Sequence, residues 1–333
     1  MIIPFFIPHS GCPHQCVFCN QKNITGQRTS VDPSSIAHTI TAYLKPLKQQ
    51  EAQVAFYGGS FTALAIEVQK SYLEACQPFI ASGRITGIRL STRPDCITRE
   101  ILAFLRDHQV ETIELGVQSM DDSVLMRSGR GHTAADTIHA VTLLREQGFT
   151  IGLQLMPGLP GDVAETFMTT VSTVIGMRPD VVRLYPALVI KDTPLETLYR
   201  TGQFTPLSLD EAVQWCKNAL LQFELANIAV IRMGLQPTEE LQRPGTILAG
   251  PYHPAFRQLV DSSILLDRMR AALQQRAPGT GSACLLSHPS DVAAAIGQKR
   301  ANIAALKKEF CLNELRVVSA PAVRKGSITY QWE

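Results

Sequence analysis

The 333-residue sequence lacks any apolar run long enough to cross a bilayer, and its start, Met1–Pro8, lacks the basic residues of a signal peptide. It also lacks charge blocks, low-complexity tracts and an excess of either charge: 31 basic residues face 29 acidic ones, for a net charge of +2. This balance does not indicate a chain-wide nucleic-acid surface, so any such surface must be local. With 45% hydrophobic and 18% charged residues, the composition is that of an ordinary soluble globular chain, and we expect no membrane association.

Eight cysteines are present, and three of them form a cluster, Cys12, Cys16 and Cys19, directly after the apolar run Ile2–Pro8. The run predicts a strand, and a loop at its end would gather three thiols at one edge of a sheet. Three thiolates can bind three irons of an iron–sulfur cluster, for which cysteine is the usual ligand. The next cysteine, Cys76, falls inside a predicted helix, so we expect the fourth iron to stay open for a ligand, as catalytic metal sites do.

Other uses of these thiols stay open at this point. A zinc site would need a fourth ligand, which His9 or His14 could supply. A disulfide is disfavoured because the sequence shows no secretory signal. Scattered cysteines indicate a reducing compartment, and we therefore expect a cytoplasmic protein.

Strands and helices alternate along the first two thirds of the sequence. Six strand–helix units of roughly 30 residues each, with one helix expected over 65–82 and a short closing strand over 229–233, predict a parallel sheet. Six such units fit an incomplete barrel, and a doubly wound open sheet is the alternative. We expect a partial barrel over residues 1–235, a helical extension and linker over 236–280, and a small α/β cap over 281–333.

Polar residues follow the predicted strands, at the edge where ligands bind in parallel α/β folds. Two glycines, Gly58 and Gly59, follow the second strand and would let a ligand approach the backbone closely. The other candidates at strand ends or inside an apolar strand are Ser60, Ser91, Gln118, Arg130 and Gln154. Gln118 offers a donor and an acceptor to a ribose or a carboxylate, and Arg130 offers a fork for a carboxylate. Plainer roles are also open, since Arg93 could brace Asp95 and His132 could cap the helix that follows it.

The spacing Cys12-x3-Cys16-x2-Cys19, with the aromatic Phe18 before the third cysteine, resembles that of the radical S-adenosylmethionine (SAM) enzymes. Further strings are similar, in order and over about residues 1–271, to the radical SAM domain of the Elongator catalytic subunit. They include Ser-Thr-Arg-Pro-Asp from Ser91, Gly-Val-Gln-Ser from Gly116, and Met-Pro-Gly-Leu-Pro-Gly from Met156. The oxygen-independent coproporphyrinogen oxidase group is a more distant relative.

This resemblance implies an incomplete parallel (β/α)6 barrel of radical SAM type with a small C-terminal α/β domain. It implies two cofactors, a [4Fe-4S] cluster on Cys12, Cys16 and Cys19, and SAM, whose reductive cleavage yields a 5′-deoxyadenosyl radical. An electron donor such as flavodoxin or ferredoxin is then expected as a partner. The residues expected to contact SAM are Phe18, Gly58, Gly59, Ser60, Ser91, Gln118, Arg130 and Gln154, and no further catalytic residue is assigned.

The sequence departs from the Elongator subunit in its ends. It shows neither the long N-terminal extension used there for tRNA nor a following acetyltransferase domain. The sequence of the segment Arg276–Gly281 matches the pattern of an acetyl-CoA loop. Such a loop must precede a helix, whereas here a strand is expected after it. We therefore predict a linker at this segment.

The C-terminal segment carries a local basic feature. A helical stretch over 291–310 contains Gly297-Gln298-Lys299-Arg300, which is similar to the RNA-gripping loop of KH domains, except that Arg300 replaces the second glycine. With Lys307 and Lys308, these residues predict a basic helix that could bind RNA, and a cap with a solvated basic face is the alternative.

Three functional hypotheses follow. The first is a radical SAM enzyme that modifies RNA, with a tRNA base as its substrate. The second is a radical SAM enzyme acting on a small metabolite or a tetrapyrrole. The third is a non-enzymatic iron–sulfur or zinc protein.

Overall fold

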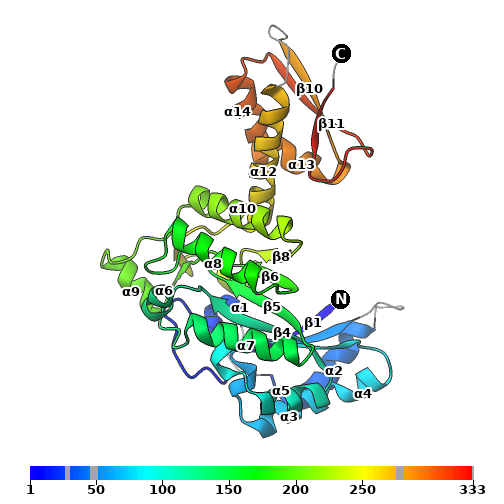
Figure 1. The fold of residues 1–333 in the computed structure, drawn as a ribbon, viewed down its shortest axis with the longest axis vertical. Helices are drawn as coiled ribbons and strands as arrows, with labels where there is room; N and C mark the ends of the chain where they lie inside the picture. The colour runs from blue at the N-terminus through cyan, green and yellow to red at the C-terminus, as the bar shows by residue number, and fades with distance from the viewer. Residues whose placement is uncertain (27–30, 46–51, 275–280, 332–333) are drawn as a thin grey trace. The chain divides into compact units, whose positions relative to one another are not determined.

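Seven parallel strands make the main sheet of the computed structural model, which describes residues 1–26, 31–45, 52–274 and 281–331 (Figure 1). Across the sheet the strands are β1 (Ile2–Ile7), β2 (Gln53–Gly58), β3 (Gly87–Thr92), β4 (Val110–Gln118), β5 (Thr150–Leu155), β6 (Val181–Leu184) and β8 (Ala229–Met233). Their order follows the chain without a reversal, whereas a doubly wound sheet reverses its order at a switch point. The sheet curls into a half-barrel, which confirms the predicted incomplete barrel, with the short closing strand as its seventh member.

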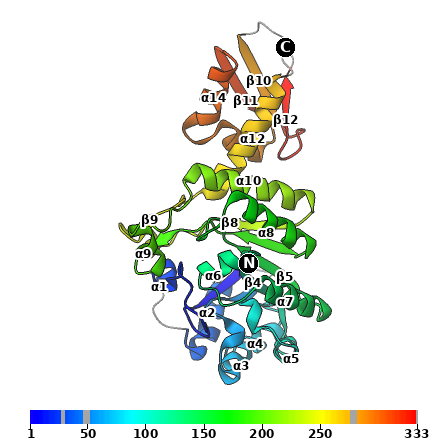
Figure 2. The same ribbon diagram turned by 60° about the vertical axis from the view of Figure 1, so that its left-hand side comes forward.

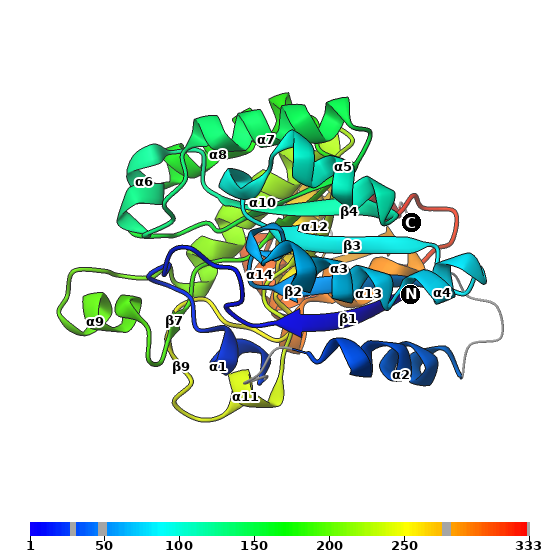
Figure 3. The same ribbon diagram turned by 90° about the horizontal axis from the view of Figure 1, so that it is seen from below.

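Helices cover the outer face of this sheet (Figure 3). They are α2 (Pro33–Leu44), α3 (Ile66–Glu74), α4 (Gln77–Ala81), α5 (Arg99–Asp107), α7 (Ala134–Glu146), α8 (Ala164–Gly176) and α10 (Leu209–Leu225). The short helices α6 (Asp122–Arg127) and α9 (Pro194–Arg200) lie at the end of the sheet and not over this face. Thr133 and Ser208 form capping boxes at the starts of α7 and α10, so the polypeptide enters each helix at a fixed residue. No helix among the described residues is long and apolar enough to cross a membrane.

The prediction of a single helix over 65–82 is wrong. The chain forms α3 and α4 instead. Cys76 lies between them as the N-cap residue of α4, and it is fully buried. Pro78 explains the break, because proline lacks the amide hydrogen that a continuous helix would need there and is favoured in the first turn of a new one.

Short elements complete the edge of the half-barrel that carries the loops. They are α1 (Gln21–Thr25), β7 (Val189–Ile190), α11 (Glu239–Gln242) and β9 (Ile247–Ala249), with 3-10 turns at Phe61–Ala63 and Pro94–Cys96. Strands β7 and β9 pair antiparallel, and α1 packs against α11.

The chain divides into two compact units, residues 1–212 with 219–252 and residues 213–218 with 253–333. The second unit holds α12 (Phe256–Gln274), β10 (Ser282–Ser287), α13 (Val292–Ile296), α14 (Ala301–Glu309), β11 (Glu314–Ser319) and β12 (Ile328–Gln331). In its sheet, β10 lies between β11, to which it is parallel, and β12, to which it is antiparallel, and α12 packs on this sheet (Figure 2). The domain boundaries predicted at residues 235 and 280 stay a prediction, and residues 276–280 of the predicted linker lie outside the described ranges.

Candidate functional site

The three clustered cysteines lie in a loop at the carboxyl end of β1. The turn after β2 holds the start of this loop, because Gly59 N–H donates to the Ile7 carbonyl at 2.9 Å and Ser60 N–H donates to the Ser10 carbonyl at 2.9 Å. The segment after α6 holds its middle, where Val17 N–H donates to the Ser128 carbonyl at 3.0 Å. The loop is therefore anchored to two neighbouring parts of the sheet edge, as expected for a site built at strand ends.

The thiols of Cys12, Cys16 and Cys19 lie close enough to influence one another. Burial raises the pKa of the Cys12 thiol, and the neighbouring Cys16 raises it further. Burial raises the pKa of Cys19 to about 12, again with contributions from Cys16 and Cys12. A raised pKa means that the thiolate form is unfavourable in the protein alone. A bound metal cation stabilises that thiolate form.

The side chains of the cysteine loop are not arranged as the ligands of a single ion. Among the described residues, no three histidine, cysteine, aspartate or glutamate side chains come together around one point. In a [4Fe-4S] cluster each thiolate binds a different iron, so the sulfurs need not converge on one atom. His9, suggested above as a zinc ligand, accepts a hydrogen bond at Nε2 from Gln21 N–H at 3.0 Å.

Arg130 provides a second sign that an anionic group belongs here. Its side chain is buried, its Nη1 donates to Cys16 Sγ at 3.2 Å, and its Nη2 donates to the Gly116 carbonyl. Its Nε is buried without a hydrogen-bond partner, and no carboxylate bonds to it in the described part of the chain. A buried guanidinium needs an anion, and thiolates that hold an iron–sulfur cluster would supply one.

Arg93, for which the sequence suggests a bracing role, does brace Asp95. Two hydrogen bonds of 2.9 and 2.8 Å join their side chains, and Arg93 also donates to the carbonyl of Arg130. Arg93 thus fixes the backbone that carries Arg130.

The glycine turn after β2 packs closely against the backbone of the cysteine loop. A Cβ on Gly59 would lie against the Ser10 carbonyl oxygen, well inside van der Waals contact, and 2.8 Å from the Ile7 carbonyl oxygen. Gly58 adopts φ of +104°, which side chains rarely allow. The hydroxyl of the following Ser60 is buried and hydrogen-bonded to Thr92 Oγ1 at 2.9 Å. These glycines let the turn pack against the cysteine loop, whatever ligand binds there.

Gln118 and Gln154 lie together at the ends of β4 and β5. Gln154 Nε2 donates to Gln118 Oε1 at 3.2 Å, and Gln118 adopts a left-handed φ of 69° at an irregularity in the strand pairing. Gly116 lacks the side chain that would collide with both Gln118 and Arg130. The structure therefore brings Gln118 beside Gln154 and close to Arg130, which bonds to Cys16. Their expected contact with SAM stays a prediction.

Phe18 and Ser91 take different places. Phe18 is half-buried and packs against Val124, Leu159 and Leu195, so it fixes the loop between the second and third cysteines. Ser91 is half-buried on β3, opposite Glu114 on β4.

A polar layer on the sheet was not predicted from the sequence. Glu114 is buried and accepts hydrogen bonds from Arg89 Nη1 at 3.0 Å and from Arg183 Nη2 at 3.0 Å. Arg183 also donates to the hydroxyls of Tyr57 at 3.2 Å and Tyr185 at 3.3 Å. These residues alternate along their strands with fully buried apolar ones such as Leu90 and Leu115, so they lie on the face away from the helices. Charged residues inside otherwise apolar strands were the signal that could have revealed this layer.

His132 is buried near Arg130 and Arg93. Burial, and then the charges of Arg130 and Arg93, lower the pKa of His132 to about 4, so its ring is neutral at pH 7. Neither ring nitrogen makes a hydrogen bond of good geometry. The cap of α7 is Thr133, so His132 does not have the capping role suggested from the sequence.

This burial gives a pH prediction. In the unfolded chain His132 takes up a proton below about pH 6.5, whereas the folded protein resists protonation down to about pH 4. Folding stability should therefore fall as the pH drops through that window, because the unfolded state binds the extra proton. A His132→Gln variant should lose less stability between pH 7 and pH 4.5 than the parent in urea unfolding. Parallel curves for the two proteins would contradict the assignment of a neutral, buried ring.

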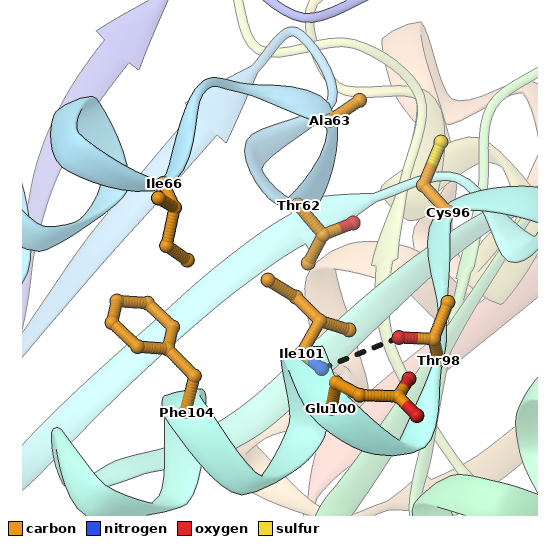
Figure 4. Close-up of a pocket in the computed structure, with 8 residues that line it drawn as sticks. All are labelled: Thr62, Ala63, Ile66, Cys96, Thr98, Glu100, Ile101 and Phe104. Atoms are coloured by element: carbon orange, nitrogen blue, oxygen red, sulfur yellow. Dashed lines mark hydrogen bonds between the residues drawn. The ribbon is translucent and has the colours of Figure 1, made fainter.

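Two cavities open near this site. The first, of about 420 Å³, lies between the Phe61–Ala63 turn and α5 and is lined mainly by apolar side chains, with the Cys96 thiol at one side (Figure 4). The second, of about 750 Å³, is more polar and includes Asn23, Lys191, Arg200 and Arg243 in its walls. It adjoins the cysteine loop, since the amide of Asn20, next to Cys19, donates to the Lys191 carbonyl at 3.1 Å.

Comparison with protein families agrees with this geometry. Residues 6–174, which run from the end of β1 through the cysteine loop and β2 to β5 into α8, match the radical SAM superfamily. The chain belongs to the radical SAM superfamily. Residues 179–265 match the radical SAM C-terminal domain.

Some relatives of this chain have names that refer to an activity on tRNA. The chain is 29% identical over 245 residues to a tRNA uridine(34) acetyltransferase of Methanocaldococcus infernus, covering 61% of this chain and 46% of that protein. It is 25% identical over 253 residues to the human Elongator complex protein 3, covering 62% and 46%. The chain thus spans about half the length of these relatives. The solved structure of the M. infernus Elp3 with an N-terminal deletion shares the fold, with a TM-score of 0.62 at 22% identity over 79% of this chain and 62% of that one.

Membership in this superfamily makes the chain a radical SAM enzyme, and the cofactors of the superfamily are a [4Fe-4S] cluster and SAM. When bound, these cofactors supply radical chemistry through reductive cleavage of SAM. The residues present fit them: three thiols at one loop, a buried cation without a carboxylate, and neighbouring amides that can orient a ligand.

Proposed function

We propose that this radical SAM enzyme modifies a base of tRNA, and that Cys12, Cys16 and Cys19 hold its [4Fe-4S] cluster. The observation that carries the proposal is the cysteine loop at the carboxyl end of β1, with the buried Arg130 bonded to Cys16. The relative named tRNA uridine(34) acetyltransferase supports the substrate, since it matches 61% of this chain.

In this proposal SAM would bind beside the turn after β2. Gly58, Gly59 and Ser60 would hold its amino group, Gln118 and Gln154 would hold its other polar groups, and Arg130 would bind its carboxylate. Phe18 and Ser91 complete the expected contacts. The enzyme also needs an electron donor such as flavodoxin or ferredoxin, and the eight free cysteines suit a reducing cytoplasm, where tRNA is present.

RNA contact is assigned to the second unit. Its turn Gly297–Arg300 joins α13 to α14, and these two helices connect the parallel strands β10 and β11. Gln298, Lys299 and Arg300 are exposed, and the last two adopt left-handed φ angles of 49° and 61°. Such strained backbone at an exposed turn is often retained for a function. The buried Asn302 side chain of α14 donates to the Ala294 and Ala295 carbonyls of α13, and so joins the two helices that flank the turn.

The structure sharpens the test of this surface. Lys299 and Arg300 precede α14, whereas Lys307 and Lys308 lie in its last turn, so the four cations form two groups at opposite ends of one helix. Changing Lys299 and Arg300 to glutamine should weaken tRNA binding and reduce the slope of its logarithmic salt dependence, by about one unit for each phosphate that the variant no longer binds. Changing Lys307 and Lys308 should have a smaller effect, because they lie away from the strained turn.

The measurement is tRNA binding at several salt concentrations, with Lys45→Gln and Lys70→Gln in the first unit as a matched removal of two charges. Iron content and SAM cleavage without substrate should not change in any of these variants. Parent protein that binds no tRNA at any salt concentration would refute the RNA substrate and favour a small metabolite or tetrapyrrole. Mass spectrometry of tRNA nucleosides from cells with and without the gene would then identify the modified base, or show that there is none.

A further inference from the structure

Arg130 makes its charge-assisted hydrogen bond with a cysteine sulfur and not with a carboxylate. The residue is 6% exposed, and its Nη1 lies 3.2 Å from Cys16 Sγ. Its Nη2 donates to the neutral Gly116 carbonyl, so among the described residues the sulfur is the one group bonded to this guanidinium that can carry a full negative charge. The sequence separates the two residues by 114 positions, and the fold brings them together.

The position of Arg130 is fixed by its surroundings. Arg93 is 4% exposed, forms a two-bond pair with Asp95, and donates to the Arg130 carbonyl. Two buried guanidinium groups and one carboxylate leave one positive charge unbalanced beside Cys16. Because Arg130 and Cys16 are both buried, this charge is weakly screened and acts strongly on its neighbour.

We propose that Arg130 raises the reduction potential of the iron–sulfur cluster through its hydrogen bond to Cys16. The proposal rests on the assignment of Cys16 as a cluster ligand in the proposed function. A [4Fe-4S] cluster on three thiolates carries one net negative charge, and one electron from the donor protein adds a second, with no bond made or broken in the protein. A cation hydrogen-bonded to a ligand sulfur stabilises the more negative, reduced state, and so makes the reduction easier.

This role differs from the expected contact of Arg130 with the carboxylate of SAM. A carboxylate contact affects SAM binding and needs SAM to be present. A bond to Cys16 acts on the cluster whether or not SAM is present. The midpoint potential measured without SAM therefore separates the two roles.

The experiment is an anaerobic redox titration of the purified, cluster-loaded protein without SAM, followed by electron paramagnetic resonance. Arg130→Gln removes the charge and shortens the side chain, so the donor to Cys16 is lost with it. At a fixed potential it should lower the ratio of reduced to oxidised cluster about tenfold, which is about 59 mV for one electron. Arg130→Lys should fall between this variant and the parent. Arg145→Gln removes an arginine that bonds only to the Met177 and Arg178 carbonyls among its described contacts, and should leave the potential unchanged.

An unchanged potential in Arg130→Gln would overturn the proposal. If SAM binding is weaker in that variant while the potential is unchanged, Arg130 contacts the carboxylate of SAM alone. Loss of the cluster from both Arg130 variants, with the circular dichroism spectrum of the parent, would assign it to cluster assembly and also overturn the proposal. A cluster retained in Cys16→Ala is a separate outcome, because it would refute the ligand assignment itself.

Discussion

Replacing any one of Cys12, Cys16 and Cys19 by alanine is expected to abolish the cluster and all cleavage of SAM. Three thiolates are the minimum that holds a [4Fe-4S] cluster with one open iron, so each substitution leaves too few ligands to retain it. The anaerobically purified parent should contain about four irons per chain, and each variant close to none. Iron and sulfide analysis, the visible absorption and the yield of 5′-deoxyadenosine measure this.

The other five cysteines provide matched controls. Burial raises the pKa of Cys76 to about 12 and raises that of Cys216 further, so both are neutral thiols within the core. Cys76→Ala and Cys216→Ala should cost stability but keep the iron, and Cys96, Cys284 and Cys311 should accept serine or alanine. Stoichiometric zinc without iron in the parent, or full iron in any variant of the clustered three, would contradict the assignment.

The substitution Gly59→Ala, which adds a single methyl group, is expected to have the second large effect on cluster and SAM binding. In Gly59→Ala the new Cβ meets the Ser10 and Ile7 carbonyl oxygens, which are backbone atoms of the cysteine loop and of β1 and cannot rotate away. Overpacking of this kind typically costs about 1–3 kcal/mol of unfolding free energy. Because the displaced segment carries Cys12, we expect iron content to fall and the dissociation constant of SAM to rise by about tenfold or more.

Gly176→Ala, at the end of α8, is the matched control, because a Cβ there meets nothing within 4 Å. It should be stable, with the iron content and SAM affinity of the parent. A Gly59→Ala protein that keeps full iron and binds SAM normally would show that the turn after β2 does not support the site. Thermal unfolding, iron analysis and equilibrium dialysis with SAM distinguish these outcomes.

The polar layer around Glu114 shows why part of the site was missed. Sequence patterns report periodicity and caps within one segment, and Arg89, Glu114 and Arg183 stand on three different strands. Their pairing depends on the register of β3, β4, β5 and β6, which no single segment encodes. Cys76 is a different case, since the split of one predicted helix into α3 and α4 follows from Pro78, a local signal to which the prediction gave too little weight.

By itself, the sequence determined the strand–helix alternation, the capped starts of α7 and α10, and the cysteine loop at the end of the first strand. These features depend on neighbouring residues, through backbone propensity, side-chain capping and the spacing of ligands along one loop. Only the tertiary structure decided that Arg130 bonds to Cys16, that Gly59 must be small to pack against Ser10, and that a charged layer lines the sheet. Those contacts join residues far apart in the chain, and they form only when parallel strands align in register and bring their carboxyl ends to one edge.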